Sequence, residues 1–122
     1  MRLGTDIIEI DRIKQAIERS DRFRQRVYTE HEIAYCENKH TGVYQSYAGI
    51  YAAKEAFMKA LGTGLRYGSW QDIEVCHDEF GAPYLSITGA FKKIIQERIC
   101  TESIVSISHC REYAMSTVII KG

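Results

Sequence analysis

The sequence predicts an α+β fold in one domain, residues 1–122. A long amphipathic pattern over residues 44–61 ends at Gly62, as expected of a helix with a C-terminal glycine. Strand-like segments rich in β-branched residues lie at both ends of the chain. No repeat, low-complexity tract or linker divides the 122 residues, a usual length for one domain.

The first part of the chain predicts a strand followed by helices. Residues 3–10 place three isoleucines around two acids, which suits a first strand. Asp11 then caps a helix whose buried stripe consists of Ile10, Ile13 and Ile17. The Ser20–Asp21 pair is a point where this helix can break. Thr29 and Glu32 form a capping-box signature for a second helix, which runs to about residue 38.

The remaining elements follow the turn signals. Residues 70–76 and 84–88 predict two strands around a turn at 80–83, and residues 89–98 predict a short amphipathic helix. Residues 103–109 and 113–120 predict a closing hairpin that turns at 110–112.

Composition argues against several classes of protein. Sixteen basic residues balance sixteen acidic ones, so overall charge gives no case for nucleic-acid binding. No apolar run reaches the roughly 20 residues that span a bilayer, so no membrane segment is expected. The four cysteines form no CxxC pair, which favours reduced thiols in the cytoplasm over a disulfide framework.

One segment is nevertheless basic. Residues 11–26 hold six basic side chains against three acids. Arg12, Arg19 and Arg26 recur every seven residues, so a continuous helix would present them on one face. Such a face either binds an acidic partner or is simply solvated.

The helix at 44–61 contains the most unusual charges. Lys54 falls inside its apolar arc, so the lysine must either snorkel to water or meet an anionic partner. Glu55 lies at the border of the arc, one turn before Lys59. On the helix alone, Glu55 and Lys59 are best read as a surface pair worth a few tenths of a kcal/mol.

The interpretation of Glu55 as part of a surface pair changes if Asp6, in the first strand, lies close to Glu55 in the fold. Two carboxylates form a hard-oxygen site that suits Mg²⁺, which keeps waters and takes further ligands from phosphate. Nearby lysines would neutralise phosphate charge. The cysteines and histidines fit no zinc spacing. The chain has no GxSxG elbow, so Ser108 and His109 at a strand end do not predict a serine hydrolase.

Several motifs resemble the holo-acyl-carrier-protein synthase family, the small bacterial 4′-phosphopantetheinyl transferases. Gly4–Asp6 resembles the family's Gly-x-Asp, and Tyr51–Gly64 (YAAKEAFMKALGTG) resembles its long Lys-Glu-Ala block. Gly81–Pro83 and Ser106–His109 match its later motifs in order and spacing, and Asp11–Ile13 fits the start of its first helix. The resemblance covers essentially the whole chain, and the Lys-Glu-Ala block is its most specific part.

The resemblance implies a phosphopantetheinyl transferase fold, with a small antiparallel sheet on a long central helix, assembled as a homotrimer. It implies Mg²⁺-dependent transfer of 4′-phosphopantetheine from coenzyme A to a serine of acyl carrier protein, in support of fatty acid biosynthesis. Asp6 and Glu55 would bind the metal and, with Lys59, form the catalytic set. The groups that would border coenzyme A are Lys54, Lys59, Gly62, Thr63, Gly64, Pro83, Ser108 and His109. The carrier protein would meet Arg12, Arg19, Arg22 and Arg26. A metal-bound water or a nearby carboxylate would accept the serine proton.

Three positions depart from the family pattern. Members often carry Arg, Asn and Lys where this chain has Ile50, Phe80 and Ala82. The 3′-phosphate of coenzyme A therefore needs other cations, and the candidates are His109, Lys39 and Arg66.

Two alternative functions would use the same residues. A non-catalytic oligomeric module would bind an acidic partner through the basic segment. A metal-dependent nucleotide hydrolase would use the same carboxylates.

Overall fold

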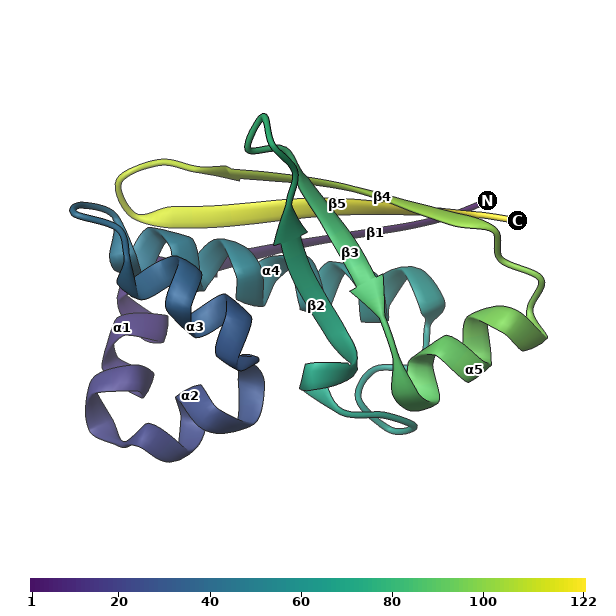
Figure 1. The fold of residues 1–122 in the computed structure, drawn as a ribbon, viewed down its shortest axis with the longest axis horizontal. Helices are drawn as coiled ribbons and strands as arrows, with labels where there is room; N and C mark the ends of the chain where they lie inside the picture. The colour runs from purple at the N-terminus through teal and green to yellow at the C-terminus, as the bar shows by residue number, and fades with distance from the viewer.

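A three-stranded antiparallel sheet lies along one side of a long helix, and the remaining elements close around that helix (Figure 1). The computed structural model describes all residues 1–122. The sheet has the order β1–β5–β4, with bounds Arg2–Glu9, Tyr113–Lys121 and Glu102–His109, and the helix is α4, Val43–Leu61. The other elements are α1 (Ile10–Arg19), α2 (Asp21–Val27), α3 (Glu30–Glu37), a 3₁₀ turn η1 (Trp70–Asp72), β2 (Ile73–His77), β3 (Pro83–Ile87) and α5 (Gly89–Glu97).

Helix α4 forms the centre of the core. Its 19 residues include few charges, because the sheet covers one side while α1, α3 and the β2–β3 hairpin pack on others. Gly42 and Gly62 flank it in the left-handed conformation, and the Gly62 amide donates to the carbonyls of Met58 and Lys59. The predicted span of 44–61 and its glycine terminus are confirmed.

Strand β1 packs unusually closely on α4 at Gly4. A Cβ at this position would lie 2.0 Å from the Ala56 carbonyl oxygen and 2.5 Å from the Ala60 amide nitrogen. Only glycine permits that approach. Because side chains alternate along a strand, Asp6 and Ile8 share the α4-facing side with Gly4.

The strand predicted at 70–76 begins later than expected. Residues 70–72 form η1 and not the start of a strand, because Ser69 and Asp72 make a capping box there. The basic segment forms two helices that meet at the Ser20–Asp21 pair, the point at which the sequence allowed a break. Ser20 is extended (φ −165°, ψ 153°) and its hydroxyl accepts the Arg22 amide, so a second helix begins and Arg26 leaves the face that carries Arg12.

The C-terminal hairpin forms as predicted, with Cys110 donating its amide to the Tyr113 carbonyl at 2.9 Å. Across the sheet, Leu3 is opposite Ile119 and Ile7 opposite Met115, on the face turned away from α4. None of the helices combines the length and apolarity that crossing a bilayer requires.

Candidate active site

Asp6 and Lys59 meet where β1 crosses α4. Lys59 Nζ lies 2.9 Å from Asp6 Oδ1, and Asp6 is mostly covered while Lys59 is about half exposed. Their meeting follows from the close packing at Gly4, which brings the strand onto the helix backbone two residues before Asp6. Residues 53 positions apart thus form one polar cluster.

Glu55 belongs to the same cluster. Burial raises the pKa of the Glu55 carboxyl, and the negative charge of Asp6 raises it further, against the attraction of Lys59. Two carboxylates therefore share one lysine, which leaves the group short of positive charge. Two carboxylates that leave coordination positions to water and phosphate are the donor set that suits Mg²⁺.

Tyr51 was not predicted as a site residue, although it lies one helical turn before Glu55. Its hydroxyl and the Glu55 carboxylate are close enough for each to shift the pKa of the other. Its ring stacks on Trp70 with centroids 5.2 Å apart. Burial raises the pKa of Tyr51, and the charges of Glu55 and Asp6 add to the shift while Arg12 opposes it. The i,i+4 spacing of Tyr51 and Glu55 was the available sequence signal.

Lys54 does not lie at an open phosphate site, contrary to its predicted place beside coenzyme A. Its side chain is fully buried, and Nζ donates to Val27 O at 2.6 Å, to Glu32 Oε1 at 2.7 Å and to Trp70 O at 3.1 Å. An ammonium has three donors, so this arrangement uses all of them. A lysine in the apolar arc was expected to pair with an anion, and Lys54 pairs with Glu32.

Glu32 joins that network to the capping box that the sequence predicted. Its Oε1 accepts the Thr29 amide at 2.9 Å as well as Lys54, and its Oε2 accepts the Val75 amide at 2.7 Å. Burial raises the pKa of Glu32 and lowers that of Lys54, and the attraction between them opposes both shifts. The capping-box signature in the sequence does not indicate that the Glu32 carboxylate also binds Lys54, 22 residues away.

Pro83 and His109 line one pocket of about 230 Å³ together with Ile50 and Lys39. Ile50 is only 2% exposed and belongs to the core as well as to the pocket wall. An arginine at that position would disturb packing of the core. Arg66 lies elsewhere, over the ring of Tyr67.

The other predicted coenzyme A residues are dispersed. Gly62 to Gly64 follow the C-terminus of α4, where Arg98 donates to the Leu61 carbonyl at 2.6 Å. Ser108 is exposed beside Ile7 and Met115 on the outer sheet face. Within one chain, these groups and the Asp6–Glu55 cluster do not line a common pocket.

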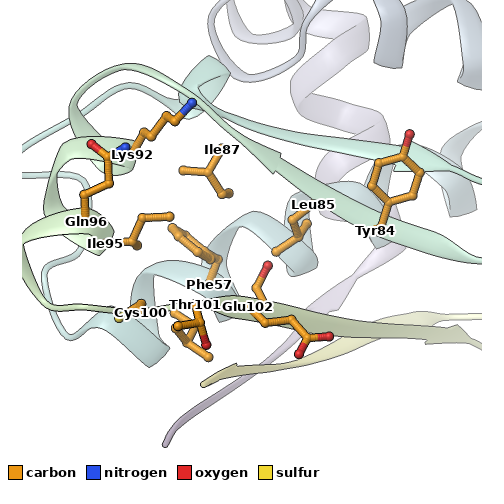
Figure 2. A pocket seen from close by; sticks show the side chains of 12 residues that line it. Phe57, Tyr84, Leu85, Ile87, Lys92, Ile95, Gln96, Cys100, Thr101 and Glu102 are labelled. Atoms are coloured by element: carbon orange, nitrogen blue, oxygen red, sulfur yellow. The ribbon is translucent and has the colours of Figure 1, made fainter. Parts of the chain in front are cut away.

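A separate cavity of about 410 Å³ lies between β3, α5 and β4 (Figure 2). Its wall is formed by apolar side chains such as Phe57, Leu85 and Ile87, with Lys92 and Glu102 also lining it. None of the predicted site residues is in it.

The four predicted carrier-binding arginines are exposed on α1 and α2, and none forms an ion pair within the chain. Arg24, between them, is instead held by Asp21 at 2.9 Å and Glu37 at 3.5 Å. Arg12 is close enough to Tyr51 to lower its pKa, so the basic surface starts beside the carboxylate cluster.

Comparison with known proteins identifies many similar chains. Holo-(acyl-carrier-protein) synthase of Ruminiclostridium cellulolyticum is 47% identical over 122 residues, covering 98% of this chain and 91% of that protein. The enzyme of the same name from Clostridium tetani is 47% identical over 120 residues, covering 98% and 94%.

Solved structures agree. The chain superimposes on Helicobacter pylori holo-(acyl-carrier-protein) synthase in complex with coenzyme A with a TM-score of 0.86, at 30% identity and with 98% and 99% of the two chains covered. The TM-score with the Neisseria meningitidis enzyme is 0.88, at 30% identity and 99% and 98% coverage. The sequence pattern of the 4′-phosphopantetheinyl transferase superfamily matches residues 2–118, and this chain belongs to that superfamily.

Proposed function

We propose that this chain transfers the 4′-phosphopantetheine group of coenzyme A to a serine of apo-acyl carrier protein, giving holo-carrier protein and adenosine 3′,5′-bisphosphate. The observation that carries the proposal is the Asp6–Glu55–Lys59 cluster, in a chain whose superfamily match spans residues 2–118. The product serves fatty acid biosynthesis in the cytoplasm.

The reaction is Mg²⁺-dependent, with Asp6 and Glu55 holding the cation. A divalent cation at such a site offsets pyrophosphate charge and stabilises the charge that develops during phosphoryl transfer. The carboxylate pair supports this proposal because Glu55 already experiences the charge of Asp6, and a cation would relieve that repulsion.

Lys59 is the mobile cation of the site. Its ammonium bonds Asp6 but remains half exposed, so it can turn to a phosphate oxygen. The serine oxygen forms a bond to the β-phosphorus of coenzyme A as the bond to 3′,5′-bisphosphoadenosine breaks, and Lys59 offsets charge on that leaving phosphate. A water at the site or a nearby carboxylate would accept the serine proton.

The carrier protein docks on Arg12, Arg19, Arg22 and Arg26. Four exposed guanidinium groups without internal partners support this, since they are available to pair with acidic groups. Arg12 would bring the carrier close to the carboxylate cluster through its position near Tyr51.

The active unit is a homotrimer in which neighbouring chains complete the coenzyme A site. The outer face of the β1–β5–β4 sheet carries uncovered Leu3, Ile7, Ile104 and Met115, which are 42–65% exposed. The separation of Gly62 to Gly64 from Ser108 and His109 in one chain also supports a site shared between chains.

The function is tested by incubating the protein with Mg²⁺, coenzyme A and apo-carrier protein, and weighing the carrier. A mass gain of one phosphopantetheine is expected, and it should disappear with EDTA and in Asp6→Asn. Cleavage of coenzyme A without carrier modification would indicate a nucleotide hydrolase. Binding of the carrier with neither reaction would indicate a non-catalytic module. Circular dichroism of Asp6→Asn controls for folding.

A further inference from the structure

The cavity of about 410 Å³ arises where the two sheets of the molecule meet (Figure 2). Strand β3 is one edge of the β2–β3 pair and β4 is one edge of the β1–β5–β4 sheet, and the two strands lie near each other without joining the sheets. Helix α5 connects them in sequence. Because no backbone ladder draws these edges together, side chains from β3, β4 and α5 surround a space instead of filling it.

The wall of the cavity is largely apolar. Leu85 and Ile87 share one face of β3, and both are only partly buried against the core, as is Ile95 of α5. Phe57 and Ile120 are buried core residues that also line the space. Protein interiors seldom leave such a volume empty, and about 300–1,000 Å³ is usual for a small-molecule site. The wall therefore favours a ligand with an apolar chain.

The charged side chains of the cavity favour one sign of ligand. Lys92 and Glu102 lie on opposite sides of it (Figure 2). Glu102 is accompanied by Lys121, whose Nζ lies 3.8 Å from Glu102 Oε2, whereas Lys92 is exposed and forms no ion pair within the chain. The cavity thus carries one uncompensated positive charge, which favours an anionic head group over a cationic one.

A second hydrogen-bond donor lies beside Lys92. Gln96 is four residues further along α5, so the ammonium and the amide are on the same face of the helix, and both residues line the cavity. Both groups donate hydrogen bonds, and a carboxylate has two oxygens to accept them. A carboxylate held at this helix face would direct its chain along the apolar wall.

The segment that leads from α5 into β4 closes one end of the cavity and is strained. Helix α5 ends in a Schellman motif, with the Cys100 amide donating to the Ile95 carbonyl at 2.9 Å and the Ile99 amide to the Gln96 carbonyl at 3.1 Å. The left-handed position of this motif is usually glycine, but here it is Ile99, with φ 56° and 77% exposure. A β-branched residue is unfavourable in that conformation. Movement of this segment would relieve the strain, so it is the part of the wall that opens to a ligand at least cost.

We propose that this cavity binds an aliphatic carboxylate, a fatty acid of short to medium chain length. Lys92 and Gln96 hold the head group, and the chain lies against the apolar side chains of β3 and α5. The cavity contains no residue of the Asp6–Glu55–Lys59 cluster, so the proposal goes beyond the proposed function and does not depend on it.

Isothermal titration of the full chain tests the choice of head group. The ligands are octanoate, octanol and octylammonium, each below its micelle concentration. Octanoate should bind most tightly, at one site per chain, and octylammonium least tightly. Lys92→Gln should weaken octanoate about two- to fivefold, the effect of one exposed charge pair, and leave octanol unchanged. Lys93→Gln is the matched control, because Lys93 is exposed on the same helix but outside the cavity, and it should change neither affinity.

Filling the cavity tests the place of the chain. Leu85→Phe and Ile95→Phe each add volume to the space, and each should abolish binding of both octanoate and octanol. Ile94→Phe is the control, because Ile94 lines a different pocket of α5. Thermal unfolding identifies which of the two filling variants is folded, and two variants are made so that a folded one is available.

Cys100 lines the cavity and reports its occupancy without any measurement of transfer. Alkylation of Cys100, followed peptide by peptide in a mass spectrometer, should slow as octanoate is added, while alkylation of the exposed Cys110 should not change. Absence of saturable octanoate binding, equal affinity for the three ligands, or unchanged binding in a folded filling variant would each overturn the proposal.

Discussion

A lysine without exposed surface is stable in its charged form only if its donors are paired, and Lys54 pairs all of them. The carbonyls come from Val27, at the end of α2, and Trp70, at the start of η1, while Glu32 comes from α3. One ammonium therefore ties three segments to α4. Lys54 immediately precedes Glu55 on α4. This buried network therefore holds Glu55 in place and is not part of the open surface of the site.

Lys54→Met tests that role. Removing one partner of a buried pair leaves Glu32 uncompensated, so unfolding in urea should show a loss of about 3–5 kcal/mol. The double variant Lys54→Met/Glu32→Gln should recover part of the loss. If Lys54 contacted phosphate instead, the single variant would keep its stability and lose only affinity for coenzyme A.

Tyr51→Phe removes the hydroxyl and keeps the ring, so it tests the two contributions of Tyr51 separately. The stack on Trp70 should remain, so the free energy of unfolding should change by no more than about 1 kcal/mol. Without the Tyr51 hydroxyl beside Glu55, the Mg²⁺ concentration for half-maximal activity should rise about fivefold, the factor that corresponds to roughly 1 kcal/mol. An unchanged Mg²⁺ requirement would show that Glu55 is positioned without Tyr51.

Among the contacts between elements, the packing of β1 on α4 determines whether the carboxylates of Asp6 and Glu55 lie close together. Gly4→Ala would place a methyl group against the α4 backbone, which cannot give way as a flexible side chain can. We expect a loss of about 1–3 kcal/mol on urea unfolding, the usual cost of overpacking. Because Asp6 would shift with the strand, turnover should fall more than the folded fraction does. Full activity in the folded variant would mean that the Asp6–Glu55 spacing is not critical.

The basic surface of α1 and α2 gives a second test at this scale. Arg12→Glu and Arg22→Glu should each raise the KM for carrier protein strongly and leave the KM for coenzyme A nearly unchanged. Added salt should weaken wild-type docking more than variant docking, because screening acts on the charge pairs. Lys93→Glu, on α5, is the control for charge reversal outside the surface. Salt-insensitive kinetics and unchanged carrier affinity would identify the arginines as a solvated face.

The sequence predicted elements well wherever one local signal dominated. Helix α4 has an apolar stripe and a terminal glycine, and the hairpin of β4 and β5 has two alternating segments around a turn. Prediction failed where a short-range cap competes with periodicity, since the Ser69–Asp72 capping box replaced the start of a strand with a 3₁₀ turn. The break at Ser20–Asp21, by contrast, was indicated by the sequence.

The sequence likewise predicted some contacts of the candidate site and not others. Asp6 and Glu55 were placed together because a motif resemblance linked them, and the structure brings them together through Gly4. The partner of Lys54 was not predictable, because Glu32 is distant in sequence and already explained by its capping box. The stack of His77 on Tyr35 depends on how α3 meets the hairpin, and no periodicity reports such a contact.

For the whole molecule, the two faces of the sheet differ in what covers them. Val105, Ala114 and Val118 are buried against α4. On the opposite face, Leu3 and Ile7 are 65% and 63% exposed, and Ile104 and Met115 extend the apolar area across all three strands. A contiguous apolar area of this kind on a small chain marks an interaction surface. Cyclic assembly of identical chains is a common way to cover one.

Ile7→Asp tests the assembly, because it puts a charge in the middle of that outer face without touching the core. We expect light scattering to give a trimer mass for the wild type and a monomer mass for the variant at the same concentration. The monomer should keep its circular dichroism spectrum, since the β1–β5 ladder needs only backbone groups at this position. It should also lose most of its carrier modification if neighbouring chains complete the coenzyme A site. Ile99→Asp is the control, because Ile99 is an equally exposed apolar residue between α5 and β4 and not on the sheet face. A wild-type protein that is monomeric at working concentration, or an Ile7→Asp variant that remains trimeric, would show that another surface or no surface joins the chains.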